Sequence, residues 1–293
     1  MVNPFTQKGT WYKANLHTHT TLSDGRATPA ERIEQYKKAG YHVLALTDHW
    51  ATHDVRGLSS KAMLIVSGIE FHPPCRHEKT DHHFVGLGVP HGLKFSLPKN
   101  ANRCIEDVHQ AGGVVILAHP FWTGIEWSTI RTLKGLDAVE VYNSTCAKIG
   151  RAQSENEWAY MLDHGMAIPA VASDDVHGGA EGIDVCQSTT WLKMPALSVA
   201  NVLKAVRTGC CYSTHGPVIH DFRFEKGRIK LRCSPAQSIH FMSMPTMGRN
   251  QYAEPGKTVT ELSTDRPDWP YVRAVVTDPQ GRKAWTNPIA PAK

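Results

Sequence analysis

The most constraining feature of this 293-residue chain is that its short strand-like runs end in side chains able to bind a metal ion. Five such runs are followed within a few residues by candidate ligands: 11–16 by His17 and His19, 42–46 by His49, 62–66 by Glu70, 114–118 by His119, and 167–172 by Asp175. In a sheet or barrel of parallel strands, the carboxyl ends of the strands share one face. The pattern therefore predicts an α/β protein with a multinuclear metal site on that face.

His17 and His19 are the first pair of candidate ligands. Side chains two apart on a strand point to one side, so both imidazoles should project together where the strand ends. The turn at 23–25 brings back Asp24, which adds a carboxylate oxygen. Mixed nitrogen and oxygen ligands suit Zn, Mn or Fe. His83 instead stands at the start of its strand, 83–87, and an antiparallel strand or a bend would bring it to the same face.

Helical segments separate these strands. Thr28 to Glu31 has the form of a capping box with Pro29 at the first helical position, and Gly40 ends that helix. Further helices are predicted at 102–111, 130–134, 153–164 and 200–208, the last with Ser198 or Asn201 as its cap. Strand followed by helix, repeated about seven times, predicts parallel strands joined by crossovers.

Composition excludes several classes of protein. Apolar residues make up 41% of the chain and charged residues 20%, which is typical of a globular protein, and no run is long enough for a membrane helix. The N-terminal segment does not resemble a secretory signal, and seven cysteines without a Cys-x-x-Cys pair indicate reduced thiols, so a cytoplasmic location is expected. The net charge of +5 is not gathered in a run, so it permits an anionic substrate without indicating an extended nucleic-acid track.

Six motifs together resemble the polymerase and histidinol phosphatase (PHP) family of metal-dependent hydrolases. In the family's order, between Tyr12 and Pro217, they are Leu16-His17-Thr18-His19 with Asp24-Gly25, Thr47-Asp48-His49, Gly68-Ile69-Glu70, His83-Phe84-Val85-Gly86, Ala118-His119-Pro120, and Ser173-Asp174-Asp175-Val176-His177. The resemblance implies a distorted (β/α)7 barrel, two or three divalent metals and, most often, phosphoester hydrolysis. The Asp-Asp-x-His form, the segment 212–217 and the β-rich tail resemble most the branch that includes a carbamate (carbaryl) hydrolase.

The resemblance also implies a role for each ligand. It places His17, His19, Glu70 and Asp175 around one metal, Glu70, His83 and His119 around a second, and Asp24, His49 and His177 around a third, with Glu70 as the bridge. Asp174 is the alternative to Asp175, which better fits the Asp-x-His spacing. His82 competes with His83, and the register of Phe84-Val85-Gly86 favours His83.

The expected chemistry uses a hydroxide shared between two metals, which needs no protein nucleophile. Glu70 is then essential as the bridge, and His177 or His215 is the candidate acid for the leaving group. A serine triad is the competing mechanism, but the sequence contains no Gly-x-Ser-x-Gly elbow. Asp48 and Glu140 are candidates to orient ligand imidazoles, with a salt-bridged structural role as the alternative for both.

Several residues near the predicted loops could contact substrate. Arg26, Lys148 and Arg151 could bind an anionic group, although each is as compatible with a solvated surface position. Asn143 follows a predicted strand and could contact substrate or make a turn. Phe121-Trp122 could line one wall of the pocket or pack as a lid.

The C-terminal quarter of the chain has a different texture. Alternating or β-branched runs at 222–224, 229–232, 238–242 and 271–276, with turns between them, predict a small antiparallel β unit. We therefore expect a metal-hydrolase barrel at 1–217 and a β-rich domain at 218–293 that covers the barrel or extends a homo-oligomer surface.

The sequence favours a metal-dependent hydrolase, most specifically a phosphoesterase acting on a small anionic phosphoester or nucleotide-type substrate. A carboxyl or carbamate ester hydrolase with the same metal centre is the enzymatic alternative. A non-catalytic module held together by metals is the third possibility, but it would be more convincing if ligand positions were lost, and here every one is filled.

Overall fold

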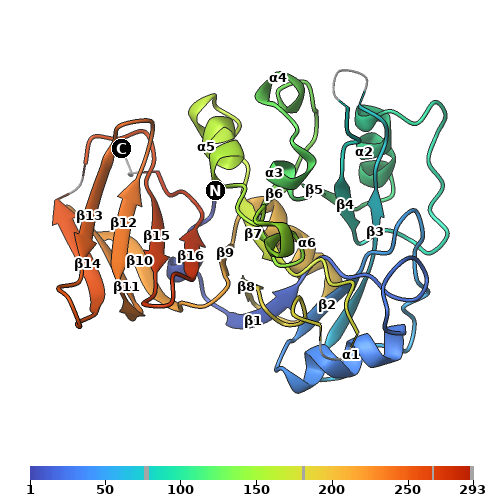
Figure 1. Ribbon diagram of the computed structural model, residues 1–293, viewed down its shortest axis with the longest axis horizontal. Helices are drawn as coiled ribbons and strands as arrows, with labels where there is room; N and C mark the ends of the chain where they lie inside the picture. The colour runs from blue at the N-terminus through green and yellow to red at the C-terminus, as the bar shows by residue number, and fades with distance from the viewer. Residues whose placement is uncertain (76–78, 180–181, 266, 291–293) are drawn as a thin grey trace.

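The computed structural model describes residues 1–75, 79–179, 182–265 and 267–290 (Figure 1). Its strands are β1 Thr10–Asn15, β2 Val43–Leu46, β3 Leu64–Phe71, β4 Phe84–Leu87, β5 Val114–Leu117, β6 Ala138–Asn143, β7 Ala170–Ser173, β8 Thr189–Met194, β9 Cys211–Thr214, β10 Ile219–Glu225, β11 Arg228–Ala236, β12 Ser238–Met242, β13 Gly248–Tyr252, β14 Val259–Asp265, β15 Arg273–Thr277 and β16 Lys283–Thr286. Its helices are α1 Pro29–Lys38, α2 Ala101–Gln110, α3 Pro120–Thr123, α4 Trp127–Ile130, α5 Glu155–Asp163 and α6 Val199–Thr208, with short 3₁₀ turns at Pro4–Thr6 and Cys146–Ile149.

A 13-stranded sheet in the order β13-β12-β15-β16-β9-β8-β1-β2-β3-β4-β5-β6-β7 forms the framework. β1, β2 and β3 are parallel, as are β5, β6 and β7, and β4 lies antiparallel between the two groups. The prediction that an antiparallel strand carries His83 is confirmed, because the start of β4 lies at the end of β3. The predicted parallel strands are thus present in two groups, while β8 pairs antiparallel with both β1 and β9.

The large sheet curls so that β7 approaches β8 and β9. The Thr190 hydroxyl accepts a hydrogen bond from the Ala172 backbone N–H and donates to the Ala172 carbonyl, both at 2.9 Å, and the Ser213 hydroxyl donates to the Ala170 carbonyl at 3.2 Å. Side chains thus connect strands at this seam, where no backbone ladder joins β7 to β8 or β9 within the described residues. The fold is mixed α/β, and closure into a (β/α)7 barrel stays a prediction.

The helix predictions from local sequence largely match. Thr28 caps α1 as expected: its hydroxyl accepts from the Glu31 N–H, and the Glu31 carboxylate accepts from the Thr28 N–H at 2.8 Å. Ser198, rather than Asn201, is the cap of α6. The helix predicted at 130–134 is wrong in position, because the turn of α4 ends at Ile130.

The C-terminal strands divide between two sheets. β10, β11 and β14 form a separate antiparallel sheet, whereas β16 pairs with β9 and so continues the large sheet into β15, β12 and β13. Arg273 and Trp285 donate hydrogen bonds to the Glu155 carboxylate at the start of α5, which ties these strands to that helix. The proposed boundary at 217/218 stays a prediction.

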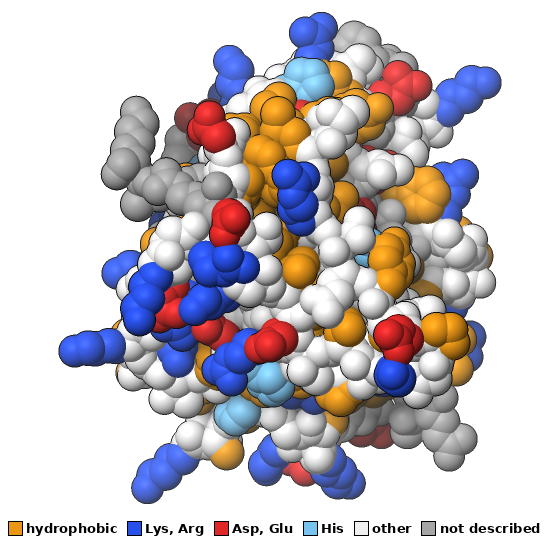
Figure 2. All heavy atoms as spheres, turned by 90° about the vertical axis from the view of Figure 1, so that its left-hand side faces the viewer, with side chains coloured by type: hydrophobic (Ala, Val, Ile, Leu, Met, Phe, Trp, Pro, Cys, Tyr) orange, Lys and Arg blue, Asp and Glu red, His pale blue; other side chains and the backbone are white. Residues whose placement is uncertain are grey.

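The end of the molecule formed by these strands carries charges of both signs. On this face, Lys and Arg side chains lie among Asp and Glu side chains, and hydrophobic side chains gather in its upper part (Figure 2). In the described part of the chain, no helix combines the length and the apolar character needed to cross a membrane.

Candidate metal centre

The core of the site is a set of four side-chain atoms held together at the ends of β1, β3 and β7. His17 and His19 follow β1 and are fully buried, and their Nε2 atoms lie 3.1 Å apart. Glu70 Oε2 lies 3.1 Å from His17 Nε2 and 3.0 Å from His19 Nε2, and Asp175 Oδ1 lies 3.2 and 3.0 Å from the same two atoms. Ligands of a tetrahedral ion at about 2.0–2.1 Å are about 3.3–3.4 Å apart, so this set is close to the size of a metal site.

Glu70 extends this set towards a second one. Its other oxygen, Oε1, lies 2.8 Å from His83 Nδ1 and 3.4 Å from His119 Nε2. The sequence placed Glu70 just after a strand, but it lies inside β3, whose extended backbone points the carboxylate between the two groups. One carboxylate therefore offers one oxygen to each group.

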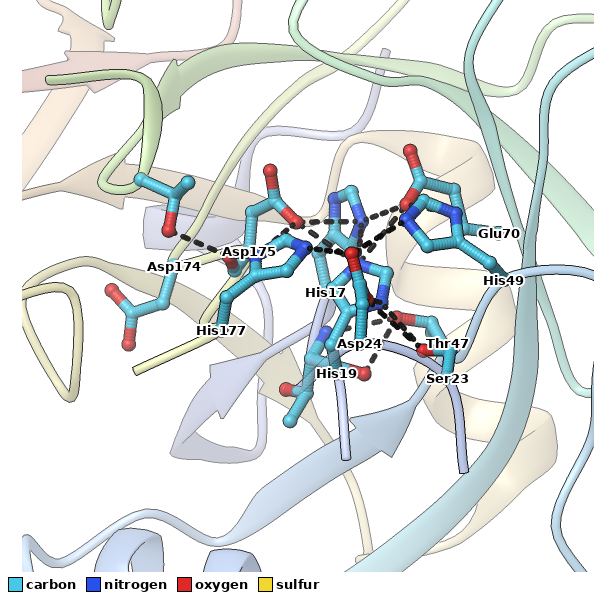
Figure 3. Close-up of polar contacts among 12 residues, drawn as sticks. His17, His19, Ser23, Asp24, Thr47, His49, Glu70, Asp174, Asp175 and His177 are labelled. Atoms are coloured by element: carbon cyan, nitrogen blue, oxygen red, sulfur yellow. Dashed lines mark hydrogen bonds and ion pairs between the residues drawn. The ribbon is translucent and has the colours of Figure 1, made fainter. Parts of the chain in front are cut away.

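A third group lies nearer the surface. Asp24 Oδ2 is 3.3 Å from His177 Nε2 and 3.6 Å from His49 Nε2, and Asp24 Oδ1 is 3.5 Å from His19 Nδ1. Asp24 is about half exposed. Figure 3 shows these side chains directed towards the buried set, so all nine predicted ligands form one cluster. We call these nine residues the histidine–carboxylate cluster.

The backbone at the cluster adopts conformations that are uncommon for residues with a side chain. Asp175 has φ of 53° and His119 has φ of 29°. Such positive φ values cost free energy and tend to occur at functional sites. Gly25 shows a related constraint, because a Cβ there would lie 2.5 Å from the His19 carbonyl. The return of Asp24 to the cluster thus needs glycine next to it.

A second layer of polar residues fixes the orientation of the ligands. Glu140 accepts a hydrogen bond from His17 Nδ1 at 2.9 Å and another from the His119 backbone N–H at 3.0 Å. Asn143 is buried and its amide donates to Glu140 and to Asp175 at 3.0 and 3.2 Å. Glu140 therefore orients an imidazole, and Asn143 lies behind the ligands. Of its two predicted roles, the structure supports the turn, because its side-chain oxygen accepts from the Cys146 backbone N–H at 3.0 Å.

Both ambiguous ligand assignments have a clear geometric outcome. The Asp174 carboxylate points away from the cluster and accepts hydrogen bonds from Tyr36, Ser144 and Ser188 (Figure 3). Burial outweighs these bonds and raises the pKa of Asp174 to about 6. His82 stacks on Phe84 and lies near the Pro73 carbonyl. The structure places Asp175 and His83, not their neighbours, in the cluster.

Two further aspartates hold the loops. Asp48 accepts hydrogen bonds from the Thr20 and Ser23 backbone N–H groups, so it fixes the 20–23 loop and not a ligand imidazole. The sequence did not indicate Asp184, whose buried Oδ2 accepts from Thr145, Lys148 and the His177 backbone N–H. Nothing local marks it, because its partners lie up to 39 residues away.

The electrostatics of the cluster suit a cation. Burial opposes charge on His19, but the hydrogen-bonded Asp175 and Glu70 carboxylates outweigh it and raise the pKa of His19 to about 9. Desolvation dominates at the less buried His49 and lowers its pKa to about 4. Among the described residues, His49 Nδ1 and His119 Nδ1 are buried without a hydrogen-bond partner. Buried polar atoms without partners and a mixed nitrogen–oxygen donor set both fit divalent metals.

The cluster opens into a cavity of about 250 Å³, which we call the metal cavity. Trp122, Thr145 and Cys146 line it together with seven of the predicted ligands. Trp122 thus lines the metal cavity, which agrees with the first of its two predicted roles, a pocket wall or a packed lid. Arg151 lies outside this lining and packs on Phe121.

His215 is not brought to the cluster. Its ring stacks on Tyr142 with centroids 4.0 Å apart, and its Nε2 accepts a hydrogen bond from the Lys283 backbone N–H at 2.9 Å. The ring therefore packs between β6 and the C-terminal strands. The predicted acid role for His215 has no geometric support.

Solved structures with a similar fold exist, although no protein-family model and no curated protein matches the sequence. A two-domain protein from Bacteroides vulgatus ATCC 8482, containing a predicted PHP-like metal-dependent phosphoesterase, is 14% identical, and the match covers 96% of each chain with a TM-score of 0.57. An amidohydrolase from Chromobacterium violaceum with bound sulfate and no metal is 18% identical over 59% of this chain and 89% of that one, with a TM-score of 0.47. A candidate metal-dependent phosphoesterase from Bifidobacterium adolescentis ATCC 15703 is 15% identical over 65% and 94%, with a TM-score of 0.48.

The first likeness shows that the chain shares the fold of that two-domain protein over nearly its whole length. At this level of identity it shows the fold and not the activity, and the other two likenesses are too weak to support a conclusion. None of the three is described as a carbamate hydrolase, so the expected kinship to that branch stays a prediction.

Proposed function

We propose that this protein is a metal-dependent phosphoesterase. The observation that carries the proposal is the division of the Glu70 carboxylate, whose Oε2 belongs to the set with His17 and His19 while Oε1 belongs to the set with His83 and His119. A carboxylate shared in this way is how two-metal hydrolases hold their ions a few Å apart. The donor set suits Mn, Zn or Fe.

When bound, two divalent ions supply Lewis acidity and a water activated for attack near neutral pH. The chain's own residues hold the ligands in place for this chemistry. Glu140 fixes the His17 ring through Nδ1, which leaves Nε2 free to bind. Asn143 holds both Glu140 and Asp175, so the two sets of ligands share one rigid support.

The residues that line the metal cavity offer no competent protein nucleophile. Burial raises the pKa of the Cys146 thiol well above its usual value, so its thiolate does not form near neutral pH. The single proton of the Thr145 hydroxyl is already engaged, because the Asp175 carbonyl and the Asp184 carboxylate both lie within hydrogen-bond distance as acceptors, at 2.7 and 2.8 Å. Direct attack by water is therefore the route that the cavity supports.

The third group of ligands favours phosphate over a neutral ester. Asp24, His49 and His177 lie at the mouth of the metal cavity, where a further ion would offset the second charge of a phosphomonoester. A neutral carboxyl or carbamate ester has no such charge. The volume of about 250 Å³ is enough for a phosphoryl group.

Metal analysis and a matched ester panel test the proposal. The chelated protein is reloaded with Mn, Zn or Fe(II), its metal content is measured, and hydrolysis of 4-nitrophenyl phosphate, bis(4-nitrophenyl) phosphate, 4-nitrophenyl acetate and a 4-nitrophenyl carbamate is compared. We expect at least two ions per chain and the highest kcat/KM on the phosphomonoester. If the acetate or the carbamate is hydrolysed with a higher kcat/KM than the phosphate esters, the protein is a carboxyl or carbamate ester hydrolase and not a phosphoesterase.

Metal content distinguishes the remaining possibilities if no ester is hydrolysed. Two or more ions per chain with no hydrolysis of any ester would support the non-catalytic module. Less than one ion per chain after reloading would contradict the metal centre itself.

A further inference from the structure

A second cavity of about 550 Å³ opens beside the metal cavity, and we call it the side cavity. Among the described residues, it is lined by Asp24, Arg26, Lys148, His177, Gly178, Gly179, Gly182, Ile183 and Asp184. Asp24 and His177 line both cavities, so the two adjoin at the third ligand group. A substrate whose phosphoryl group lies in the metal cavity can therefore extend into the side cavity.

Two glycines that line the side cavity lie too close to Asp184 to carry a side chain. A Cβ at Gly178 would lie 2.5 Å from Asp184 Oδ1, and one at Gly182 would lie 2.6 Å from the same atom. Asp184 is fully buried, and its Oδ2 accepts from the His177 and Gly178 backbone N–H groups. The aspartate that positions His177 thus also requires glycine at these two positions.

The two basic residues of the side cavity differ in how their charges are used. Lys148 Nζ lies 2.8 Å from Asp184 Oδ2, so a buried carboxylate neutralises its charge. The Arg26 guanidinium has no ion pair or side-chain hydrogen bond among the described residues. The Arg26 backbone N–H donates to the His177 carbonyl at 2.9 Å, which fixes its position beside the third ligand group. Arg26 is thus the uncompensated cation of this cavity.

An apolar side chain borders the same space. Ile183 lines the side cavity and is 74% exposed, so it offers an apolar surface that a ligand in this cavity would contact. The cavity therefore combines these two glycines, one apolar contact and one free guanidinium.

We infer that the substrate's leaving group occupies the side cavity and carries an anionic group that Arg26 binds. This inference rests on the proposed phosphoesterase function and adds the class of its substrate: a phosphomonoester of an alcohol that bears a second negative charge, carboxylate or phosphate. A planar guanidinium suits either anion by paired hydrogen bonds.

The chemistry balances with water as the only co-reactant. The water oxygen forms a bond to phosphorus, the bond between phosphorus and the leaving oxygen breaks with its electron pair on that oxygen, and a proton from water ends there. The products are inorganic phosphate and the anionic alcohol, and no electron is gained or lost.

Two phosphomonoesters of matched shape test the inference. With metal-loaded protein, we expect kcat/KM for 4-carboxyphenyl phosphate to exceed that for 4-carbamoylphenyl phosphate by about tenfold, the order of one charge-assisted hydrogen bond. This preference should shrink as salt rises from 0.05 to 0.5 M because the guanidinium is exposed. Replacing the carboxylate by phosphate in 1,4-phenylene bisphosphate should preserve it.

Arg26→Ala should remove most of the preference, and Arg26→Lys should restore part of it. Arg103→Ala is the matched control, since Arg103 is an exposed arginine on α2 and its loss changes the net charge equally. Equal kcat/KM on the two esters in the wild type, or the same preference in Arg26→Ala, would overturn the inference while leaving phosphoester hydrolysis standing. Hydrolysis of neither ester would instead overturn the proposed function, and the inference with it.

Discussion

Glu140 offers the sharpest test of how the buried ligands are held. Glu140 is 1% exposed and is not one of the nine predicted ligands. Its carboxylate accepts hydrogen bonds from His17 Nδ1, the His119 backbone N–H and the Asn143 amide at 2.9–3.0 Å. For His17 to bind a metal through Nε2, its proton must stay on Nδ1. The Glu140 carboxylate is the acceptor that keeps it there.

Glu140→Gln keeps the shape of this side chain and removes one acceptor. If the amide NH₂ faces His17, it opposes the Nδ1 proton; if it faces His119 and Asn143, it opposes two other donors. One charge-assisted hydrogen bond is worth about 1.5–3 kcal/mol. A tenfold change in affinity corresponds to about 1.4 kcal/mol, so we expect metal affinity to fall by about 10–100-fold.

Calorimetric titration of chelated protein with Zn or Mn measures this effect. Glu155→Gln is the matched control, because Glu155 also accepts from buried partners, Arg273 and Trp285, but lies outside the cluster. The control should lower the melting temperature and leave metal affinity unchanged. A Glu140→Gln protein that binds metal within about twofold of the wild type would refute the reasoning.

Three further predictions concern single side chains. Glu70→Gln should lose metal pairing and hydrolysis together, because both of its oxygens are in use; metal analysis that still finds two ions would show that Glu70 is not the bridge. His177→Asn should keep two ions and lower kcat/KM on a phosphomonoester by about a hundredfold, with a much smaller loss on a neutral ester of the same leaving group; equal losses would make the third group structural. Burial lowers the pKa of His215 to about 4, so below pH 6.5 the unfolded chain binds a proton there that the folded chain does not. The contribution of His215 to the free energy of unfolding therefore falls as pH drops from 7 towards 4. The difference in unfolding free energy between the wild type and His215→Gln should narrow over that range, and a constant difference would contradict this.

The ligands could be predicted from the sequence because most of them follow recognisable buried strands. Each buried run places the next polar residues at a strand end, and the parallel groups bring those ends together, which is why His17, His119 and Asp175 meet. Strand period does not distinguish Asp174 from Asp175; the Asp-x-His spacing favoured Asp175, and the physical reason for that choice appears only in the folded chain. The choice depends on a φ of 53° at Asp175, which turns one carboxylate into the cluster and leaves the other among hydroxyl donors.

Residues that act through tertiary packing were beyond local reasoning. His215 follows a motif that suggested catalysis, yet the Tyr142 ring and the Lys283 backbone hold it away from the cluster. Asp184 is the opposite case: no sequence motif predicts its role, and its contacts with Thr145 and Lys148 form only in the folded chain. The C-terminal strands were predicted as a separate unit, but pairing of β16 with β9 joins part of them to the large sheet.

The last prediction concerns how the stability of the metal-free protein and its affinity for metal depend on pH. Without metal, the buried carboxylates of Glu70 and Asp175 are balanced by protonated imidazoles, and His19 holds its proton up to a pKa of about 9. Since this pKa is raised above the unfolded value of about 6.5, the stability gained from that proton is full below about pH 6.5 and is lost as pH rises through about 9.

Metal must displace the same proton, so affinity should rise by up to about tenfold per pH unit over this interval. A bound ion stabilises the folded state by about 2.7 kcal/mol at a hundred times its Kd. The gain in melting temperature from chelated to metal-loaded protein should therefore increase from pH 6.5 to pH 8.5. Titrations in buffers of different ionisation enthalpy should show release of about one proton per ion in the buried set. A gain that is flat with pH, or binding without proton release, would mean that protons and metal do not compete for His19.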